Sequence, residues 1–319
     1  MLPAPPRAAC KSGGKRRGRL KTKLKPPAAR NPFSNTKPVF RRPQTPQTPP
    51  APNPHRNKNM DKLTLALITK NEAANLAACL DSAKPLACPI VIIDSGSTDD
   101  TPAIAERYGA QFHVFPDWPG FGPQRNRAHP HIHTDWVLWL DADERLTPEL
   151  CRSIQAAVAA TPADGRTAFA FNRLSNTFGK FIRHSGWYPD WVVRLYPAAH
   201  ARYSDDLIHE KVLLPANCRT GKLSGDCLHY TYATLDQFLQ KQNLYSTAWA
   251  EQRRLHMKRT GLAAAFLHST AAFVKMYLLK AGFLDGRHGL LLAALSAQSA
   301  FNKYAALWLA ANTPPEQDK

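Results

Sequence analysis

Apolar and polar residues alternate in blocks along residues 62–160, and these blocks predict strands and helices in turn. Short apolar runs are typical of buried strands, whereas apolar residues spaced three or four positions apart are typical of helices. The expected strands are 63–69, 89–93, 111–115 and 136–140, and the expected helices are 72–82, 99–108, 122–131 and 148–160. This order predicts an α/β fold with a mainly parallel sheet, right-handed crossovers and flanking helices.

The last third of the chain predicts long helices. They are expected at 234–256, 262–279 and 289–311, with a turn at 282–286. The second and third are apolar enough to suggest membrane spans, but His268 and Lys275 interrupt one, and Lys303 interrupts the other. Because a charge in the middle of a bilayer is costly, we expect these helices to lie in the membrane interface. The alternative is a helical subdomain packed against the sheet.

Positive charge is concentrated at the N-terminus. Residues 1–59 hold 15 Lys and Arg, no Asp or Glu and 13 of the 27 prolines, so the net charge of +18 falls to +3 for the remainder. Such a segment cannot bury enough apolar surface to fold alone, and it lacks the apolar core of a secretory signal. It is either a polybasic arm for anionic lipid or nucleic acid, or an artefact preceding a natural start at Met60.

The cysteines predict a reducing compartment. None of the six forms a C-x-x-C pair, and no secretory signal accompanies them, so free thiols in a cytoplasmic protein are expected. The six are Cys10, Cys79, Cys88, Cys151, Cys218 and Cys227.

Candidate chemistry begins where the strand at 136–140 ends. Asp141, Asp143 and Glu144 place three carboxylates within four residues at the carboxyl end of a buried strand. Open α/β sheets place their ligand crevice at this edge, and an Asp-x-Asp pair there can share one divalent cation. The alternative is an acidic loop before a helix that starts near Thr147.

Two other strand ends carry polar residues. Asn71 and Glu72 follow the first strand, and Asp94, Ser95 and Gly96 follow the second. An acidic side chain at a strand end can accept a hydrogen bond from a ribose hydroxyl or a base, and glycine permits close approach of a ligand. The Ser and Thr residues that follow Gly96 could instead be helix N-caps.

Absent motifs narrow the class of ligand. No G-x-G-x-x-G follows the first strand, no P-loop sequence occurs, and no H-x-E accompanies a C-x-x-C. A cation held between carboxylates, supported by Arg125, remains the available means of binding phosphate. The set indicates an enzyme that acts on a sugar nucleotide.

Several motifs resemble known enzymes. Segments 68–72, 93–101, 118–126 and 140–145 resemble inverting family 2 glycosyltransferases with the GT-A fold. Segments 183–190, 193–196, 204–210 and 282–289 resemble, more narrowly, the lipopolysaccharide-core β-1,4-glucosyltransferases that extend the inner-core heptose. The similarity runs from residue 62 to about residue 310. It implies a GT-A domain at 60–230, between the disordered basic tail that composition predicts at 1–59 and the membrane-associating helical region that the apolar helices predict at 231–319.

The resemblance implies roles for individual residues. Asn71, Glu72 and Asp94, with Ser95 and Gly96, would line the uridine site, and Arg125 would lie near the nucleotide. Asp141 would face the ribose or the sugar. Asp143 would hold Mg²⁺ or Mn²⁺ against the diphosphate of UDP-glucose, where the cation neutralises charge on the leaving group.

An inverting transfer also needs a general base near the acceptor hydroxyl. Glu210 is preferred, because it borders the apolar run at 212–214, where partial burial would make its carboxylate a better base. Asp206 is the second candidate. Many family members carry a Glu-Asp pair here, so the departure in this sequence leaves the base open.

Four further residues have open roles. His209 could be a metal ligand beside Asp143, or an acceptor contact, or a structural residue. Trp187 and Tyr188 could stack on a sugar ring or simply pack a loop. Arg194 interrupts an apolar strand, so it needs either a phosphate or a structural carboxylate as its partner.

The sequence therefore predicts a peripheral enzyme on the cytoplasmic face of the bacterial inner membrane that adds one glucose from UDP-glucose to the lipopolysaccharide core. The Q-x-x-R-W signature of processive synthases is absent, so a single addition is expected. The alternatives are another family 2 enzyme acting on a lipid-linked acceptor, a nucleotidyltransferase, which would release pyrophosphate, and a nucleic-acid-binding protein that uses the basic tail.

Overall fold

The computed structural model describes residues 62–205, 210–254 and 261–312. All of these belong to one unit, residues 55–319. The basic tail, Asp206 and His209 therefore lie outside the described residues. The predicted division of residues 60–319 at residue 230 stays a prediction.

The N-terminal half of the main sheet is parallel, as the strand–helix order predicted. Its strands are β1 (Leu63–Thr69), β2 (Ile90–Asp94), β3 (Gln111–Val114) and β4 (Trp136–Asp141), in the spatial order β3-β2-β1-β4. Helices α1 (Leu76–Ala83), α2 (Thr101–Arg107), α3 (Phe121–Asn126) and α4 (Pro148–Ala160) follow them in the chain. The register pairs Thr69 with Asp94 and Ile68 with Asp141, so three strands end at the same edge.

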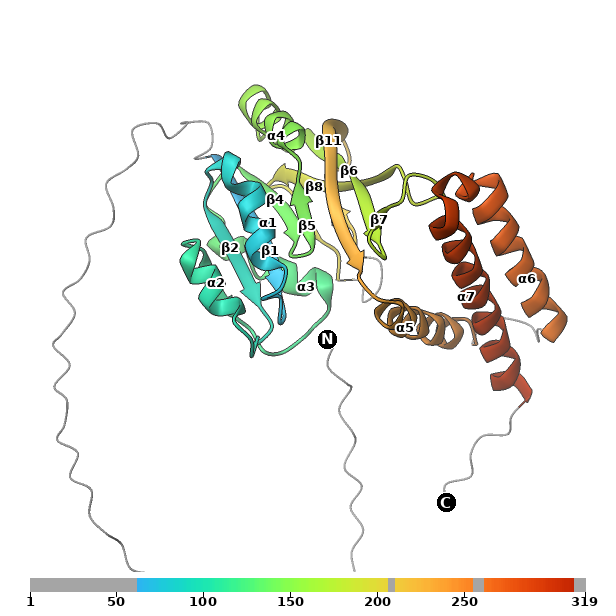
Figure 1. The fold of residues 1–319 in the computed structure, drawn as a ribbon. Helices are drawn as coiled ribbons and strands as arrows, with labels where there is room; N and C mark the ends of the chain where they lie inside the picture. Colours follow the sequence, from blue (N-terminus) through green and yellow to red (C-terminus); the bar gives the residue numbers. More distant parts are fainter. Residues whose placement is uncertain (1–61, 206–209, 255–260, 313–319) are drawn as a thin grey trace, which may run out of the picture. The chain divides into compact units, whose positions relative to one another are not determined.

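The sheet continues through strands that add antiparallel pairing. They are β8 (Asp190–Pro197), β6 (Thr167–Thr177), β11 (Arg219–Tyr232) and β5 (Glu144–Leu146), in that order beyond β4, with β7 (Lys180–Phe181) beside β6. Only two residues separate β4 from β5 in the chain, although three strands lie between them in the sheet, so the sheet curls back on itself (Figure 1). The predicted mixed α/β architecture with flanking helices is confirmed.

Both faces of the sheet are buried, which explains the unbroken apolar run of β4. Leu63, Leu65 and Leu67 of β1 pack with α1, α2 and α4 on one face. Ala66 of β1 packs on the other face with Trp139, whose ring meets the Tyr203 ring edge-on at 5.5 Å between centroids. Tyr203 belongs to a small second sheet of β9 (Arg202–Tyr203) and β10 (Val212–Leu213), which is thereby fixed beside β4.

The C-terminal helices agree closely with the predicted ranges. They are α5 (Leu235–Arg254), α6 (Leu262–Val274), which continues as the π-helical turn η4 (Lys275–Leu279), the 3₁₀ turn η5 (Gly282–Asp285) and α7 (Gly286–Asn312). Helix α7 packs against α5 and α6 (Figure 1). A cluster that includes Ile182, Tyr232 and Phe238 joins α5 and α7 to the sheet. The helical region is therefore packed against the sheet, which was one of the two alternatives.

Asp285 anchors this junction. Its buried carboxylate accepts hydrogen bonds from the backbone N–H groups of Arg183 and His184 and from the Ser185 hydroxyl, at 2.9–3.1 Å. The Lys180 ammonium donates to the Asp285 backbone oxygen at 2.7 Å. The two sequence motifs at 183–190 and 282–289 are therefore parts of one contact.

One apolar helical stretch is strongly exposed. Residues 262–279 are long and apolar enough to cross a membrane, judged by length and composition, yet only 6% of them are buried. Phe266, Leu267, Leu278 and Leu279 are between 55% and 76% exposed. A surface of this kind on a soluble protein usually marks an interaction site.

Candidate active site

Asp141 is the centre of a cluster of opposite charges at the end of β4. Its two carboxylate oxygens accept hydrogen bonds from Arg125 and from Arg194, each at 2.7 Å. Loss of solvent contact raises the pKa of Asp141, but the two guanidinium groups outweigh it and hold that pKa far below its usual range. Both oxygens of Asp141 are therefore engaged by cations of the protein itself.

Arg125 joins this cluster to Glu210. The Arg125 side chain is 4% exposed, and it donates to a Glu210 oxygen at 2.5 Å as well as to Asp141. Arg125 lies in α3. In the same helix, Gly122 allows the backbone at Ser204 to approach closely, because a Cβ atom at Gly122 would lie 1.9 Å from the Ser204 carbonyl oxygen. The absence of a side chain at this position therefore lets Glu210 reach Arg125.

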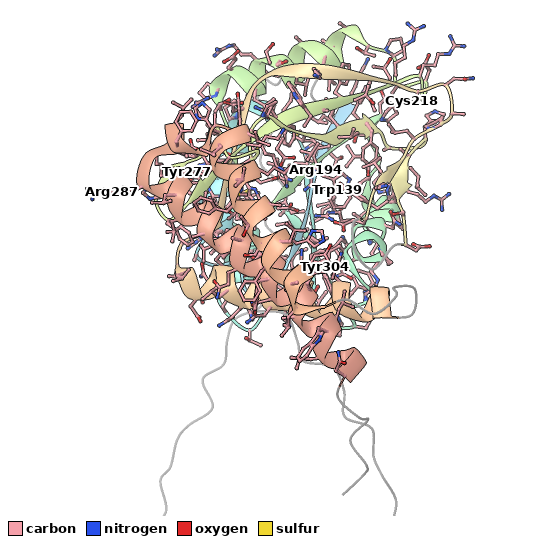
Figure 2. All side chains as sticks on the ribbon, turned by 90° about the vertical axis from the view of Figure 1, so that its right-hand side faces the viewer. Trp139, Arg194, Cys218, Tyr277, Arg287 and Tyr304 are labelled. Atoms are coloured by element: carbon pink, nitrogen blue, oxygen red, sulfur yellow. The ribbon has the colours of Figure 1, made fainter. Side chains whose placement is uncertain are left out.

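Arg194 lies on β8, next to β4, which places it beside Trp139 (Figure 2). Its guanidinium donates to the Tyr203 hydroxyl at 3.1 Å in addition to Asp141. Burial lowers the pKa of Arg194, but the negative charge of Asp141 reverses this effect, so the pKa stands well above its usual value. The structural carboxylate was one of the two partners expected for this residue, and it is the one present here.

Asp94 holds the turn that follows β2. One of its oxygens accepts from the N–H groups of Gly96 and Ser97, and the other accepts from the hydroxyls of Thr69 and Ser97, at 2.5–2.8 Å. Four donors occupy the carboxylate, which is 1% exposed. Gly96 has φ +80°, a conformation that side chains rarely adopt. The predicted contact between Asp94 and uridine would require exchange of one of these internal donors.

The first strand end is tied to the same turn. The Asn71 side-chain oxygen accepts from the Thr98 N–H at 2.8 Å, and the Asn71 N–H donates to Ser97 at 2.8 Å. Ser95 accepts from the buried Gln124 amide at 3.0 Å.

Burial raises the pKa of Glu72, and the charges of Asp143 and Asp141 raise it further. The predicted carboxylates of β1 and β4 therefore share one electrostatic environment.

Asp143 faces a histidine that the sequence did not identify. The Nε2 atom of His229 lies 3.4 Å from an Asp143 oxygen, and the His229 Nδ1 atom is buried without a hydrogen-bond partner within the described residues. His229 lies on β11 opposite Glu144 of β5. Nothing in the local sequence around His229 indicates this pairing. It arises because β11 pairs with β5, the strand that directly follows Asp143 in the chain.

Asp143 and His229 are a donor set that fits a divalent cation. A carboxylate oxygen and an imidazole nitrogen are ordinary metal ligands, and oxygens of a bound diphosphate could complete the coordination. The ion pairs with Arg125 and Arg194 leave Asp141 poorly available as a ligand. No cluster of three or more His, Cys, Asp or Glu side chains suited to a metal occurs in the described part of the chain. The assignment of Asp143 and Asp141 to a metal remains a prediction.

Glu144 is a buried carboxylate that directly follows Asp143 in the chain. One of its oxygens accepts from the Asp141 backbone N–H at 2.9 Å, and the other lies 3.7 Å from Arg173 and has no hydrogen-bond partner in the part of the chain that the structure describes. Burial raises the pKa of Glu144, and the charge of Asp141 raises it further. Glu144 therefore holds the backbone of the Asp141–Asp143 turn through its hydrogen bond with the Asp141 N–H.

Trp187 and Tyr188 lie in the loop before β8. Trp187 meets Tyr232 at 6.5 Å between ring centroids and lines a cavity among the C-terminal helices. The Tyr188 hydroxyl donates to Asp226 at 3.2 Å. The structure thus places Trp187 against the helical region, and its predicted contact with the donor sugar stays a prediction.

Comparisons with known proteins identify the class. Residues 64–209 match the model of the family described as Glycosyl transferase family 2. This range contains the β1, β2 and β4 strand ends, with Asp94, Asp141 and Asp143. Together with the glycosyltransferase relatives, this match shows that the protein is a glycosyltransferase with a family 2 domain at these residues. The family match and the mixed sheet also confirm the GT-A type of α/β fold expected from the sequence.

Relatives cover most of the chain. An uncharacterized glycosyltransferase of Rickettsia prowazekii is 29% identical over 255 residues, which cover 78% of this chain and 87% of the relative. The lipopolysaccharide core biosynthesis glycosyltransferase LpsC of Rhizobium meliloti is 27% identical over 261 residues, which cover 76% and 93%. Among solved structures, glucosyl-3-phosphoglycerate synthase of Mycobacterium tuberculosis with Mn²⁺ and UDP is 24% identical, covers 35% of this chain and 44% of its own, and has a TM-score of 0.30.

Proposed function

We propose that the protein transfers a single glucose from UDP-glucose to the inner-core heptose of lipopolysaccharide with inversion at the sugar carbon. The observation that carries this proposal is the convergence of Arg125, Arg194, Asp141, Asp143 and Glu210 at one edge of a family 2 domain. The similarity to LpsC supports a lipopolysaccharide acceptor. The choice of glucose and of heptose rests on the motifs of the sequence.

The donor would lie across the ends of β1, β2 and β4. Asn71, Glu72 and Asp94 would face the uridine. The diphosphate would lie near Asp143 and His229, which would hold Mg²⁺ or Mn²⁺. When bound there, the cation supplies positive charge to the departing diphosphate. A cation at this point would also relieve the exposure of Glu72 to neighbouring negative charge.

The two arginines would contribute to the same step. Arg125 and Arg194 are permanently charged and buried, and each donates a hydrogen bond to Asp141 in the free protein. A diphosphate oxygen could replace an Asp141 oxygen as partner of either guanidinium without moving the arginine far. These preformed donors would then stabilise the charge that develops on UDP as the bond to the sugar breaks.

Glu210 would take the proton from the acceptor hydroxyl as that oxygen bonds to the sugar carbon. In the free protein Glu210 is paired with Arg125, so substrate binding must draw Arg125 toward the diphosphate before Glu210 becomes available. This coupling would keep the base inactive until the donor is bound. Asp206 remains the second candidate for the base.

The exposed apolar side of α6 would place the enzyme on a membrane. Its location at the cytoplasmic face of the bacterial inner membrane would give it access to a lipid-linked acceptor. His268 and Lys275 within the apolar stretch favour a position in the interface over a span.

The test is a donor panel with the purified full-length protein and truncated lipopolysaccharide acceptors, read by mass spectrometry. We expect a mass gain of one hexose with UDP-glucose and release of UDP. Release of pyrophosphate would instead establish a nucleotidyltransferase. RNA binding that is lost in a protein beginning at Met60, together with no turnover of any UDP-sugar, would establish a nucleic-acid-binding protein.

A further inference from the structure

A second concave site lies among the C-terminal helices. An open cavity of about 550 Å³ is lined by α5, α6, α7 and the loop that carries Trp187. This volume falls within the range of sites that hold small molecules. The cavity is separate from the Asp141 cluster, whose residues do not line it.

The wall of this cavity is positively charged. Lys275 of η4 and Lys303 of α7 both line it, and the described lining residues include no Asp or Glu. The Lys303 ammonium stands over the Trp249 ring, 6.0 Å from its centroid. Two cations with no carboxylate among the described lining residues favour an anionic ligand.

The rest of the wall has the composition of a saccharide site. Trp187, Trp249 and Tyr304 supply aromatic faces on which a sugar ring can stack. The Tyr304 ring is itself held in place by the His268 ring, stacked at 3.9 Å with 5° between planes. Ser299, which is buried, donates to Gln242 at 2.9 Å, so a polar edge is also fixed in the wall.

The cavity adjoins the exposed apolar surface of α6. The residues of this helix that line the cavity recur at helical spacing, at positions 268, 271, 272, 275 and 276. Leu267, Val274 and Leu278 fall on the neighbouring side of the same helix and are exposed. Lys275 begins a π-helical turn, an irregularity that is frequent at functional sites. A ligand whose lipid part lies in a membrane could therefore place its polar part in the cavity.

The cavity is within reach of the transfer site. Trp187 and Arg194 are seven residues apart on the same strand and its leading loop, so their Cα atoms are at most about 25 Å apart. An acceptor several sugar units long can bridge this distance.

We propose that the cavity binds an acidic saccharide, carrying phosphate or carboxylate groups, that belongs to the glycolipid acceptor. This inference rests on the proposed function, and it adds a binding site remote from the reacting hydroxyl. Lys275 and Lys303 pair with the anionic groups, and the aromatic side chains stack on the sugar rings.

The test measures binding of deacylated, phosphorylated lipopolysaccharide core oligosaccharide to the full-length protein by calorimetry. The double variant Lys275→Gln with Lys303→Gln should weaken binding by about tenfold or more, as expected for loss of charged hydrogen bonds. Ala272→Phe, which fills the cavity without changing charge, should weaken it as well. The same oligosaccharide freed of phosphate should bind weakly and equally to the wild type and the double variant.

Arg287→Gln is the matched control. Arg287 is exposed on α7, does not line the cavity and lies about 25 Å along the helix from Tyr304 (Figure 2). A loss as large in Arg287→Gln as in the double variant, or no loss in the double variant and in Ala272→Phe, would overturn the proposal. Lysine-dependent binding to phosphatidylglycerol vesicles without binding of the oligosaccharide would also overturn it, in favour of a lipid headgroup.

UDP binding is measured in the same samples and separates this proposal from the proposed function. Wild-type protein that binds the oligosaccharide but no UDP would refute the donor site and leave the cavity proposal standing. Intact UDP binding without lysine-dependent binding of the oligosaccharide would refute the cavity alone.

Discussion

Substitution of Asp141 and Asp143 by asparagine, one at a time, separates the two carboxylates of the Asp-x-Asp pair. Both substitutions replace a carboxylate by an amide of nearly the same size. The two positions lie two residues apart, but their surroundings differ. Asp141 neutralises Arg125 and Arg194, which are both buried, whereas the ion-pair partner of Asp143 among the described residues is His229, at 3.4 Å. The account therefore predicts that Asp141 stabilises the fold and that Asp143 serves the chemistry.

The expected loss for Asp141→Asn follows from the two ion pairs. Removing one partner of a buried pair typically costs 3–5 kcal/mol, because a buried charge is left without compensation. Asn keeps one acceptor oxygen, Glu210 remains near Arg125, and the Asp141 side chain is 26% exposed, so we expect about 2–3 kcal/mol of lost unfolding free energy. At this chain length that corresponds to a melting temperature lower by roughly 4–12 °C.

The assay is thermal and urea unfolding of both variants beside the wild type, with donor turnover measured on the same samples. Asp143→Asn should melt within about 2 °C of the wild type and lose metal-dependent turnover. The pKa of Asp141 is lowered by folding, so its stabilisation should persist down to about pH 4 and disappear only in stronger acid. Equal melting temperatures for Asp141→Asn and the wild type would refute the reasoning.

Four further outcomes are expected. Glu210→Gln should bind UDP-sugar normally but transfer slowly, and retained turnover in steady-state kinetics would remove Glu210 as the base. Gly122→Ala should lower both the melting temperature and the activity, because its Cβ would lie 1.9 Å from the Ser204 oxygen; wild-type values for both would show that the loop yields freely. The pKa of Glu144 is raised above 4.5 by folding, so the folded protein holds a proton that the unfolded chain has released, and this residue makes stability fall as pH rises above 4.5. Melting curves of Glu144→Gln from pH 4 to pH 8 should lack this component, and parallel pH profiles for variant and wild type would contradict it. Deletion of residues 1–59 should leave transfer to a soluble acceptor unchanged, whereas a large loss of rate would assign the tail a catalytic role.

Much of the architecture could be predicted from hydrophobic pattern. The parallel strands β1, β2 and β4 are continuous apolar runs because both faces of the sheet are covered, and their predicted limits agree with the structure to within one residue. The edge at which Asp94 and Asp141 meet followed from the parallel order alone. These are local or topological features that the periodicity of the chain determines.

Long-range pairing could not be predicted in the same way. His229 reaches Asp143 because β11 runs antiparallel to β5, more than 80 residues away in the chain, and no local signal marks that register. The partner of Arg194 was open for the same reason, since a charge in an apolar strand shows only that some partner exists. The contact between segments 183–185 and Asp285 explains two motifs whose relation the sequence left unknown.

The central claim is that Asp143 and His229 hold a cation against the diphosphate of a sugar nucleotide at the edge of β4. Calorimetric titration of UDP into the full-length protein, with and without Mn²⁺, tests it most directly. The account predicts that UDP binds to the wild type only when Mn²⁺ is present, and that Asp143→Asn loses this binding while its melting temperature stays unchanged. Equal UDP binding with and without the cation, in both proteins, would contradict the account.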